Sequence, residues 1–336
     1  MDNTLNDSLP LDKTKKGVTT YMPTPVDQKH ITDYKMVTDL FDFHVLKQSP
    51  NFAVKHYKDS CYRGEIVDKK RHGLGVCVYS NNRVYEGNWL SDKRHGKGYE
   101  KFSNGNTYLG DYANGKVDGK GLYKFSNGES YDGEWHEGIK HGYGVWKGSN
   151  GDSYVGQWHQ NKAHGFGIHE WINGDKYEGE WHNCLRHGKG TDWFATGDKY
   201  TGNYKYGRVD GQGEYRWANG NFYKGEFKDD MMCGKGIWRK SESDPNSDTY
   251  EGEYLDDKKH GYGEFKWQSG GSYKGDYAND LKQGYGEMQW TDGSIYRGTW
   301  DKGVQNGLGI IIFANGTRKA GIFQDNKLME LLTNKK

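Results

Sequence analysis

Histidine is the residue type in this sequence that could most readily bind a metal ion, and it recurs at a fixed spacing. Six histidines precede a glycine at the same point of a repeated pattern: His72, His95, His141, His164, His187 and His260. A second row keeps the same spacing: His136, His159 and His182. Such rows could ligate a metal ion, but equivalent positions on adjacent hairpins lie about 9–10 Å apart. Two nitrogens on one zinc must lie within about 4 Å, so the spacing favours histidines that stabilise turns and predicts no metal site.

Carboxylates recur in the same pattern and raise the question of acid–base catalysis. They occupy the middle of the first predicted strand in several repeats: Glu65, Asp111, Glu134, Glu180, Glu226, Glu253 and Asp276. A pair of carboxylates can act as general acid and base. Each member of this row has much the same environment, however, so none is singled out for a shifted pKa. With no phosphate-binding loop, dinucleotide fingerprint or nucleophile elbow in a strand–helix context, the sequence predicts a solvated polar face, no catalytic site and no cofactor.

Basic residues cluster just before the repeated His-Gly and are candidates for an anion-binding edge. They are Lys69, Lys70, Arg71, Lys93, Arg94, Lys140, Arg186, Lys258 and Lys259. Near an anionic leaflet each Lys or Arg contributes about 1 kcal/mol, so a stripe of them could hold anionic lipid or an acidic protein tail. The alternative is a set of solvated loops. The net charge is only +1, without the basic excess of a duplex-DNA binder, so we expect no nucleic-acid partner.

All of these residues lie on a 23-residue repeat. Tyrosines mark its phase, with one four-residue insertion near residues 241–248: Tyr62, Tyr85, Tyr108, Tyr131, Tyr154, Tyr177, Tyr200, Tyr223, Tyr250, Tyr273 and Tyr296. A glycine follows two residues later and a large apolar residue two further on. From the second repeat to the eleventh we take those apolar residues as candidate partner-binding aromatics: Trp89, Tyr112, Trp135, Trp158, Trp181, Tyr204, Phe227, Tyr254, Tyr277 and Trp300.

The pattern within each repeat predicts a β-hairpin. Y-x-G-x-W and the following H-G-x-G-x-aromatic both alternate with period two, which is typical of strands with one apolar face. Asn-Gly or Asp-Gly separates most repeats and favours a type I′ turn, with positive φ at both central residues. Glycines inside strands are tolerated where another group approaches the backbone, and we expect that group to be a ring from a neighbouring repeat.

The consensus Y-x-G-x-W, H-G-x-G and N-G resembles the membrane occupation and recognition nexus (MORN) repeat over residues 62–325. The resemblance implies an all-β fold: an elongated single-layer antiparallel β-hairpin array of about twelve 23-residue repeats, with short helical or irregular caps. Lys319 stands in the tyrosine position of the twelfth, degenerate repeat.

The two ends lie outside the repeat. Residues 1–61 form an N-terminal extension in which the apolar spacing predicts a helix over 31–46. This helix either caps the first hairpin, lies in the trough of the array, or docks a partner. Residues 326–336 form a C-terminal tail in which Leu328, Leu331 and Leu332 fit a short capping helix. Four cysteines without a CxxC pair predict free thiols in a reducing compartment, and no apolar run suits a secretory signal or a membrane span.

The resemblance implies a non-enzymatic structural scaffold that binds other proteins of a large cytoskeletal assembly. Proteins of this repeat-only type occur in radial spoke heads, so we expect a location in the cytoplasm and cytoskeleton, in the axoneme of a cilium or flagellum. The alternative is a peripheral membrane or phosphoinositide-binding tether that uses the basic edge for weak contact with anionic lipid. An enzyme with a degenerate active site is a third hypothesis, and homodimerisation is left open.

Overall fold

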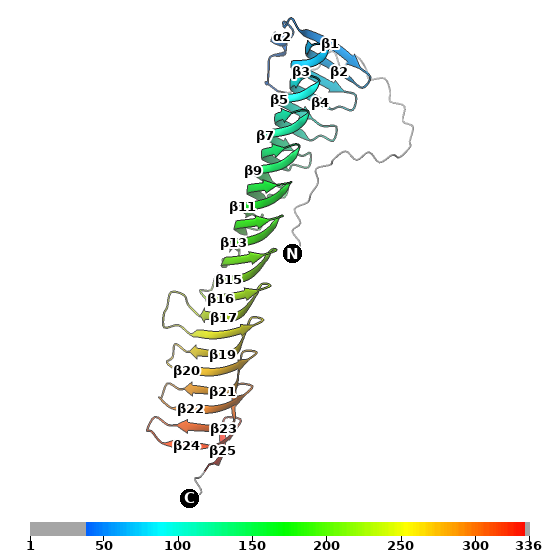
Figure 1. The fold of residues 1–336 in the computed structure, drawn as a ribbon. Helices are drawn as coiled ribbons and strands as arrows, with labels where there is room; N and C mark the ends of the chain where they lie inside the picture. Colours follow the sequence, from blue (N-terminus) through cyan, green and yellow to red (C-terminus); the bar gives the residue numbers. More distant parts are fainter. Residues whose placement is uncertain (1–37, 333–336) are drawn as a thin grey trace. The chain divides into compact units, whose positions relative to one another are not determined.

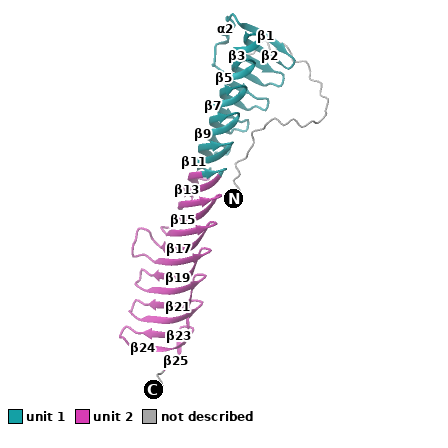
Figure 2. Ribbon diagram, viewed as in Figure 1, with its two compact units in different colours: residues 1–172, 181–184 teal, residues 173–180, 185–336 magenta. Residues whose placement is uncertain are grey.

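The computed structural model describes residues 38–332, which form 25 antiparallel strands in one open sheet and one single-turn helix (Figure 1). The chain divides into two compact units (Figure 2). The described part of unit 1 comprises residues 38–172 and 181–184, and that of unit 2 comprises residues 173–180 and 185–332. The predicted class, a single-layer array of β-hairpins, is confirmed.

In unit 1 each strand pairs with the next along the chain. The strands are β1 (Phe52–Tyr57), β2 (Ser60–Val67), β3 (Lys70–Tyr79), β4 (Val84–Leu90), β5 (Lys93–Lys101), β6 (Thr107–Ala113), β7 (Lys116–Lys124), β8 (Ser130–His136), β9 (Ile139–Lys147), β10 (Ser153–His159) and β11 (Lys162–Glu170). The strand β12 (Lys176–His182) contains residues of both units.

From β13 onward, unit 2 repeats the same pairing of each strand with its successor. Its strands are β13 (Leu185–Trp193), β14 (Lys199–Lys205), β15 (Arg208–Arg216), β16 (Phe222–Lys228), β17 (Met231–Arg239), β18 (Thr249–Leu255), β19 (Lys258–Lys266), β20 (Ser272–Ala278), β21 (Leu281–Gln289), β22 (Ile295–Asp301), β23 (Val304–Ile312), β24 (Arg318–Gln324) and β25 (Lys327–Leu331).

The turns correct one prediction. Positive φ at two successive residues, the mark of type I′, occurs at the turn inside a repeat, as at Asn114 (52°) and Gly115 (88°). At the Asn-Gly between repeats only the glycine has positive φ, 97° at Gly128. Its N–H donates to Phe125 O at 3.1 Å, which is the three-residue loop of a type I turn followed by a glycine bulge. The Asn127 side chain stabilises this loop instead, because its Oδ1 accepts from Glu129 N at 3.0 Å.

The core lies on one face of the sheet, which we call the core face. The repeat tyrosines there are almost fully buried, and each ring covers glycines of its own repeat. A Cβ added at Gly75 would lie 2.3 Å from Tyr62 Oη, and one at Gly64 would lie 2.5 Å from the same atom. The expectation that a neighbouring repeat supplies this ring is therefore wrong. The hydroxyl stays satisfied because Tyr62 Oη donates to Glu65 O at 2.8 Å.

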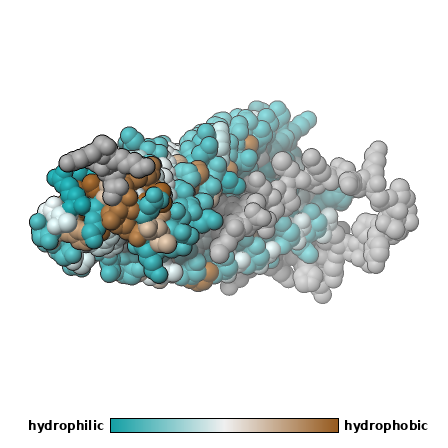
Figure 3. Space-filling model, turned by 90° about the horizontal axis from the view of Figure 1, so that it is seen from below, coloured by the Kyte–Doolittle hydropathy of each residue, from teal (hydrophilic) through white to brown (hydrophobic). Residues whose placement is uncertain are grey.

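The ends of the described chain contain less helix than the sequence predicts. Within the predicted helix 31–46 only α2 (Phe43–Leu46) is helical, residues 38–42 are not, and residues 31–37 lie outside the described part. The strand β1 then adds to β2, so the sheet begins before the first repeat tyrosine. The predicted C-terminal helix is also wrong: the tail forms β25, which pairs with β24. Apolar side chains gather at this end of unit 2 (Figure 3), where Met329, Leu331 and Leu332 are exposed.

The insertion near residues 241–248 forms the loop between β17 and β18. The carboxylate of Glu242 accepts two bonds from Arg216, at 2.7 and 2.8 Å. Asp244 accepts from Gln268 Nε2 at 3.0 Å, and Ser247 Oγ donates to Ser241 O at 2.9 Å. The loop is thus fastened to the repeat before it and the repeat after it.

Candidate functional site

The ten candidate partner-binding aromatics belong to the core. Their exposed fractions are only 3–7%: Trp89, Tyr112, Trp135, Trp158, Trp181, Tyr204, Phe227, Tyr254, Tyr277 and Trp300. Each of these rings packs edge-to-face on repeat tyrosines. Trp135, for example, meets Tyr131 at 5.0 Å and Tyr108 of the preceding repeat at 5.9 Å between ring centroids. The prediction that these rings present a partner-binding surface is wrong, because the tyrosines on either side leave no room for a ligand.

Tryptophan at this position also fixes the contact between successive repeats. Trp135 Nε1 donates to Gly121 O of the preceding repeat at 3.0 Å, and Trp158 Nε1 donates to Gly144 O at 3.2 Å. The turns add a second link, since Gly115 N donates to Arg94 O at 2.9 Å. The backbone bonds recur along the array, and in the repeats with tryptophan the side-chain bonds add to them in holding a hairpin in register on its neighbour.

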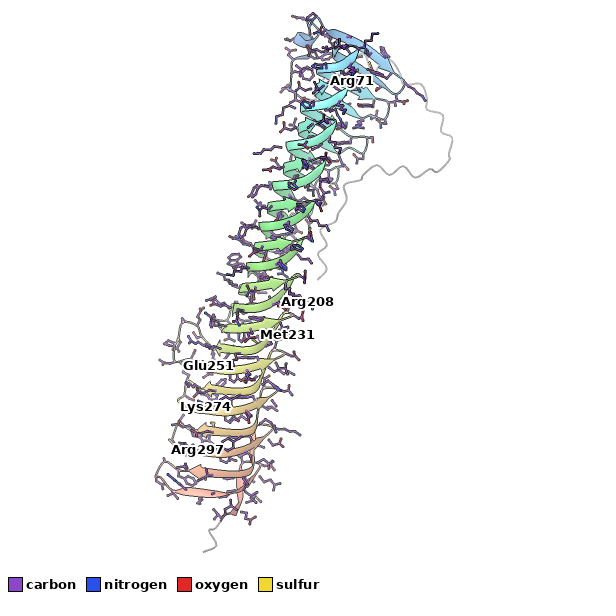
Figure 4. The ribbon with its side chains drawn as sticks, viewed as in Figure 1. Arg71, Arg208, Met231, Glu251, Lys274 and Arg297 are labelled. Atoms are coloured by element: carbon purple, nitrogen blue, oxygen red, sulfur yellow. The ribbon has the colours of Figure 1, made fainter. Side chains whose placement is uncertain are left out.

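The predicted anion-binding edge is divided by the structure. Arg71, Arg94, Lys140, Arg186 and Lys259 lie against core rings. Arg71 Cζ is 4.2 Å from the Trp89 centroid, and its Nε is 3.1 Å from Asp92 Oδ1 (Figure 4). The exposed members lie in a turn or on the first residue after one: Lys69, Lys70, Lys93 and Lys258. Exposed aspartates such as Asp68 and Asp92 share those turns, so the nine residues form no continuous cationic stripe.

Two buried carboxylates on the core face were missed by the sequence analysis. Glu100 is fully buried, is paired with Arg83 and Arg94, and accepts from Tyr112 Oη at 2.9 Å. Their sequence signal is an acid in the aromatic position of the second strand, with arginine six residues before it and tyrosine in place of tryptophan twelve residues after it.

Asp192 repeats that arrangement in unit 2. It is 3% exposed and lies 2.5 Å from Arg186 Nη1, and it accepts from Tyr204 Oη at 2.7 Å. Burial raises the pKa of the Asp192 carboxyl, and Arg186 opposes that shift. Burial and the Asp192 charge raise the pKa of the Tyr204 hydroxyl well above its usual range. Inside the core the Tyr204 hydroxyl and the Asp192 carboxylate are hydrogen-bond partners of each other.

The row of carboxylates in the first strands has a structural role. At the H-G-x-G segment the two strands of a hairpin shift register, as between Gly110 and Tyr112, and the bulged Gly119 adopts a φ of 108°. The bulge frees a backbone N–H, and the acidic side chain accepts it. Lys120 N donates to Asp111 Oδ2 at 3.0 Å. Further acceptors of the row are Glu65, Glu180, Glu226 and Asp276.

The two histidine rows interleave into one ladder. In unit 1 the ring centroids of His136, His141, His159, His164 and His182 follow one another at 6.1, 5.3, 5.7 and 4.9 Å. The neighbours are thus closer than the single-row spacing predicted. Burial, together with His182 and His159, lowers the pKa of His164. Within residues 38–332 no group of three or more potential ligands is arranged to hold a metal ion.

The other face of the sheet, which we call the open face, differs between the two units. One cross-strand column of unit 1 is apolar on six of the seven strands β5–β11, with Asp132 on β8 as the exception. We name its apolar members the open-face stripe: Tyr99, Leu109, Leu122, Val145, Val155 and Ile168. The equivalent column of unit 2 is charged over β18–β22. Glu251, Lys274 and Arg297 lie one above another on β18, β20 and β22 (Figure 4).

The four cysteines are free. No helix in the described part of the chain has the length and apolar character needed to cross a bilayer.

The profile of a family described as MORN repeat matches eleven segments of the chain. They are residues 62–82, 85–107, 108–130, 131–153, 154–176, 177–199, 200–222, 223–242, 250–272, 273–295 and 296–318. Together these segments cover well over half of the sequence.

Solved structures show weaker likenesses. The TCP domain of SAS-4 from Drosophila melanogaster, in complex with a proline-rich motif of Ana2, is 15% identical; the match covers 48% of this chain and 85% of that one, with a TM-score of 0.30. A mutant TCP10 domain of Danio rerio CPAP is 11% identical; the match covers 75% of this chain and 98% of that one, with a TM-score of 0.21. TM-scores this low indicate neither a shared fold nor a shared function. No curated protein matches the chain.

Proposed function

Because the chain belongs to the MORN-repeat family, we propose that it is a non-enzymatic structural scaffold that binds protein partners in a cytoskeletal assembly. The observation that carries the proposal is the linking of successive hairpins by turn–carbonyl bonds, to which Trp Nε1–carbonyl bonds are added in the repeats that carry tryptophan. Such nearest-neighbour links suit a repeat array that presents fixed surfaces to several partners.

The titratable groups of the described residues support a non-catalytic role. The acidic row accepts backbone amides at the bulges, and Glu100 and Asp192 are neutralised by arginine and tyrosine inside the core. A catalytic carboxylate needs access to a substrate, and these carboxylates are committed to the fold.

The finer proposal places the scaffold in the cytoplasm, within the axoneme of a cilium or flagellum and in the manner of a radial-spoke-head protein. It rests on the family resemblance and on the repeat-only organisation of residues 62–325. The test is detergent and salt extraction of a tagged copy in its native cell, with imaging of its position. We expect retention in the detergent-insoluble axoneme. Complete release by mild detergent, with staining along a membrane, would overturn the proposal.

A membrane tether is the second candidate, favoured by the exposed lysines at the turn edge of the sheet, Lys69, Lys70 and Lys93. The test is flotation with vesicles containing phosphatidylserine or a phosphoinositide at low and high salt. The tether requires salt-sensitive binding that a variant with all three lysines changed to glutamate loses. The scaffold reading expects no flotation of either protein.

A further inference from the structure

The open-face stripe is an apolar surface, interrupted at one strand, that residues 38–332 leave uncovered. Tyr99 pairs with Leu109, and Leu109 pairs with Leu122. Asp132 interrupts the column once, and Val145, Val155 and Ile168 then continue it. Leu109 is 43% exposed, and Tyr143 and Phe166, on the same face beside the stripe, are 55% and 53% exposed. Large apolar side chains gathered on one solvated face are typical of an interaction surface.

The stripe is not a necessary product of the repeat. The same column in unit 2 carries Glu251, Glu264, Lys274, Glu287 and Arg297, and the hairpins there form with the same register as in unit 1. Since hairpin formation does not require apolar residues at these positions, their presence in unit 1 calls for another explanation.

Lysines surround one end of the stripe. Lys97, Lys101, Lys120 and Lys124 flank it on β5 and β7. On β5–β7 the open face carries one carboxylate, Asp111, which is 2.7 Å from Lys97 Nζ and also accepts the Lys120 amide. On the next strand, β8, Asp132 and Glu134 lie across from Leu122 and Lys120. Among the described residues, Lys101, Lys120 and Lys124 form no side-chain ion pair, and all three are exposed. The β5–β7 end is therefore apolar with a basic rim, whereas the β9–β11 end is bordered by Tyr143 and Phe166.

The chain itself already covers the face at the head of this stripe. Thr38 N donates to Glu86 Oε2 at 3.1 Å, and Ser49 Oγ donates to Glu65 Oε1 at 2.8 Å. Leu46 of α2 is 5% exposed. Glu86 on β4 pairs across the sheet with Tyr99, so the stripe begins where this intramolecular contact ends. A non-repeat segment thus packs on the open face, and the uncovered stripe continues the same interface.

We propose that the open-face stripe binds an acidic, amphipathic segment of a partner protein. The apolar side chains of that segment lie on Tyr99, Leu109 and Leu122, and its carboxylates pair with the flanking lysines. Its remaining apolar residues contact Tyr143 and Phe166. Six strand steps from β5 to β11 span about 29 Å, which an extended segment of about nine residues covers. The proposal rests on the scaffold function and assigns the chemistry of one partner site.

The experiment places a photo-crosslinking amino acid at Leu109 or Phe166 of the full chain in its native cell. The matched control is Leu308, an exposed apolar residue on the open face of unit 2. We expect crosslinks from Leu109 and Phe166 to one partner, within a segment that alternates apolar residues with aspartate or glutamate. Crosslinks to a second copy of this chain, to lipid, or to a basic segment would overturn the proposal, as would equal crosslinking to the same segment from Leu308.

Charge and apolar contact are then tested separately in binding of the crosslinked segment, made as a synthetic peptide, to the full-length protein. Leu109→Glu and Lys124→Glu should each weaken binding about tenfold. Lys274→Glu, at an exposed lysine of the unit 2 open face, should leave it unchanged. If the protein stays in the detergent-insoluble fraction while Leu109 and Phe166 give no crosslink, the docking site is wrong and the scaffold stands. Release by mild detergent, without crosslinks at any position, would overturn both the docking site and the scaffold function.

Discussion

Acid should weaken unit 1 through one buried imidazole, His169. The ring is 4% exposed and stacks on Trp171 with centroids 4.2 Å apart. Neither ring nitrogen has a hydrogen-bond partner among the described residues. Burial lowers the pKa of His169 from 6.5 to about 4, and the Asp152 charge opposes this only in part. The folded protein therefore holds the ring neutral at a pH where the unfolded chain protonates it.

The sign and size of the effect follow from proton linkage. Because the unfolded state binds the proton more readily, stability is complete above pH 6.5 and falls as the pH drops, levelling off below pH 4. With these pKa values the loss is about 2 kcal/mol at pH 5 and about 3 kcal/mol below pH 4. His169→Phe removes the titrating group while retaining a flat ring for Trp171. The variant should lose about 2 kcal/mol less than the parent between pH 7.5 and pH 5.

The assay is hydrogen exchange of the β10 and β11 amides at both pH values, because a repeat array need not unfold as one cooperative unit. His56→Phe is the matched control, since His56 is an exposed histidine on β1 and lies outside the histidine ladder. A direct NMR titration of the His169 ring gives its pKa. A measured pKa of 6 or more, or the same pH dependence in parent and His169→Phe, would refute the reasoning.

Three further predictions concern stability, each read from urea unfolding against the parent. Asp192→Ala should cost about 2 kcal/mol, because it leaves the half-buried Arg186 guanidinium without its carboxylate; a neutral result would mean that water replaces the pair. Gly121→Ala should cost about 3 kcal/mol, since its Cβ would lie 2.3 Å from a repeat tyrosine hydroxyl. Gly115→Ala meets nothing within 4 Å and should cost only about 1 kcal/mol for its φ of +88°; equal costs would contradict the ring-over-glycine packing. Tyr131→Phe removes the bond to the Glu134 carbonyl and should cost about 1 kcal/mol; no loss would show that this bond adds nothing.

The sequence was sufficient to predict the class of fold because its two periods, of two residues and of 23 residues, act between residues close together in the chain. Alternation with period two places Tyr108, Gly110 and Tyr112 on one face of a strand whatever surrounds them. The 23-residue period makes each hairpin pair with the next, and the registers Gly110↔Gly121 and Gly98↔Gly110 follow from it. The chain ends lacked that period. Leu328, Leu331 and Leu332 have the spacing of a helix. The tail forms a strand instead because it pairs with the otherwise free edge of β24.

Only the tertiary structure decided which side chains remain available to a partner. Alternation says that Trp135 shares a face with Tyr131, but not that Tyr108 of the preceding repeat closes that face. Arg71 was assigned to an anion-binding edge from its charge, whereas its position over the Trp89 ring depends on how two hairpins stack. The sequence by itself determined the strands, the repeat and the composition of each column. Contacts between repeats decide which side chains are buried. The packed hairpins therefore bury the aromatics that the sequence suggested as a partner surface and leave the open-face stripe exposed to a partner.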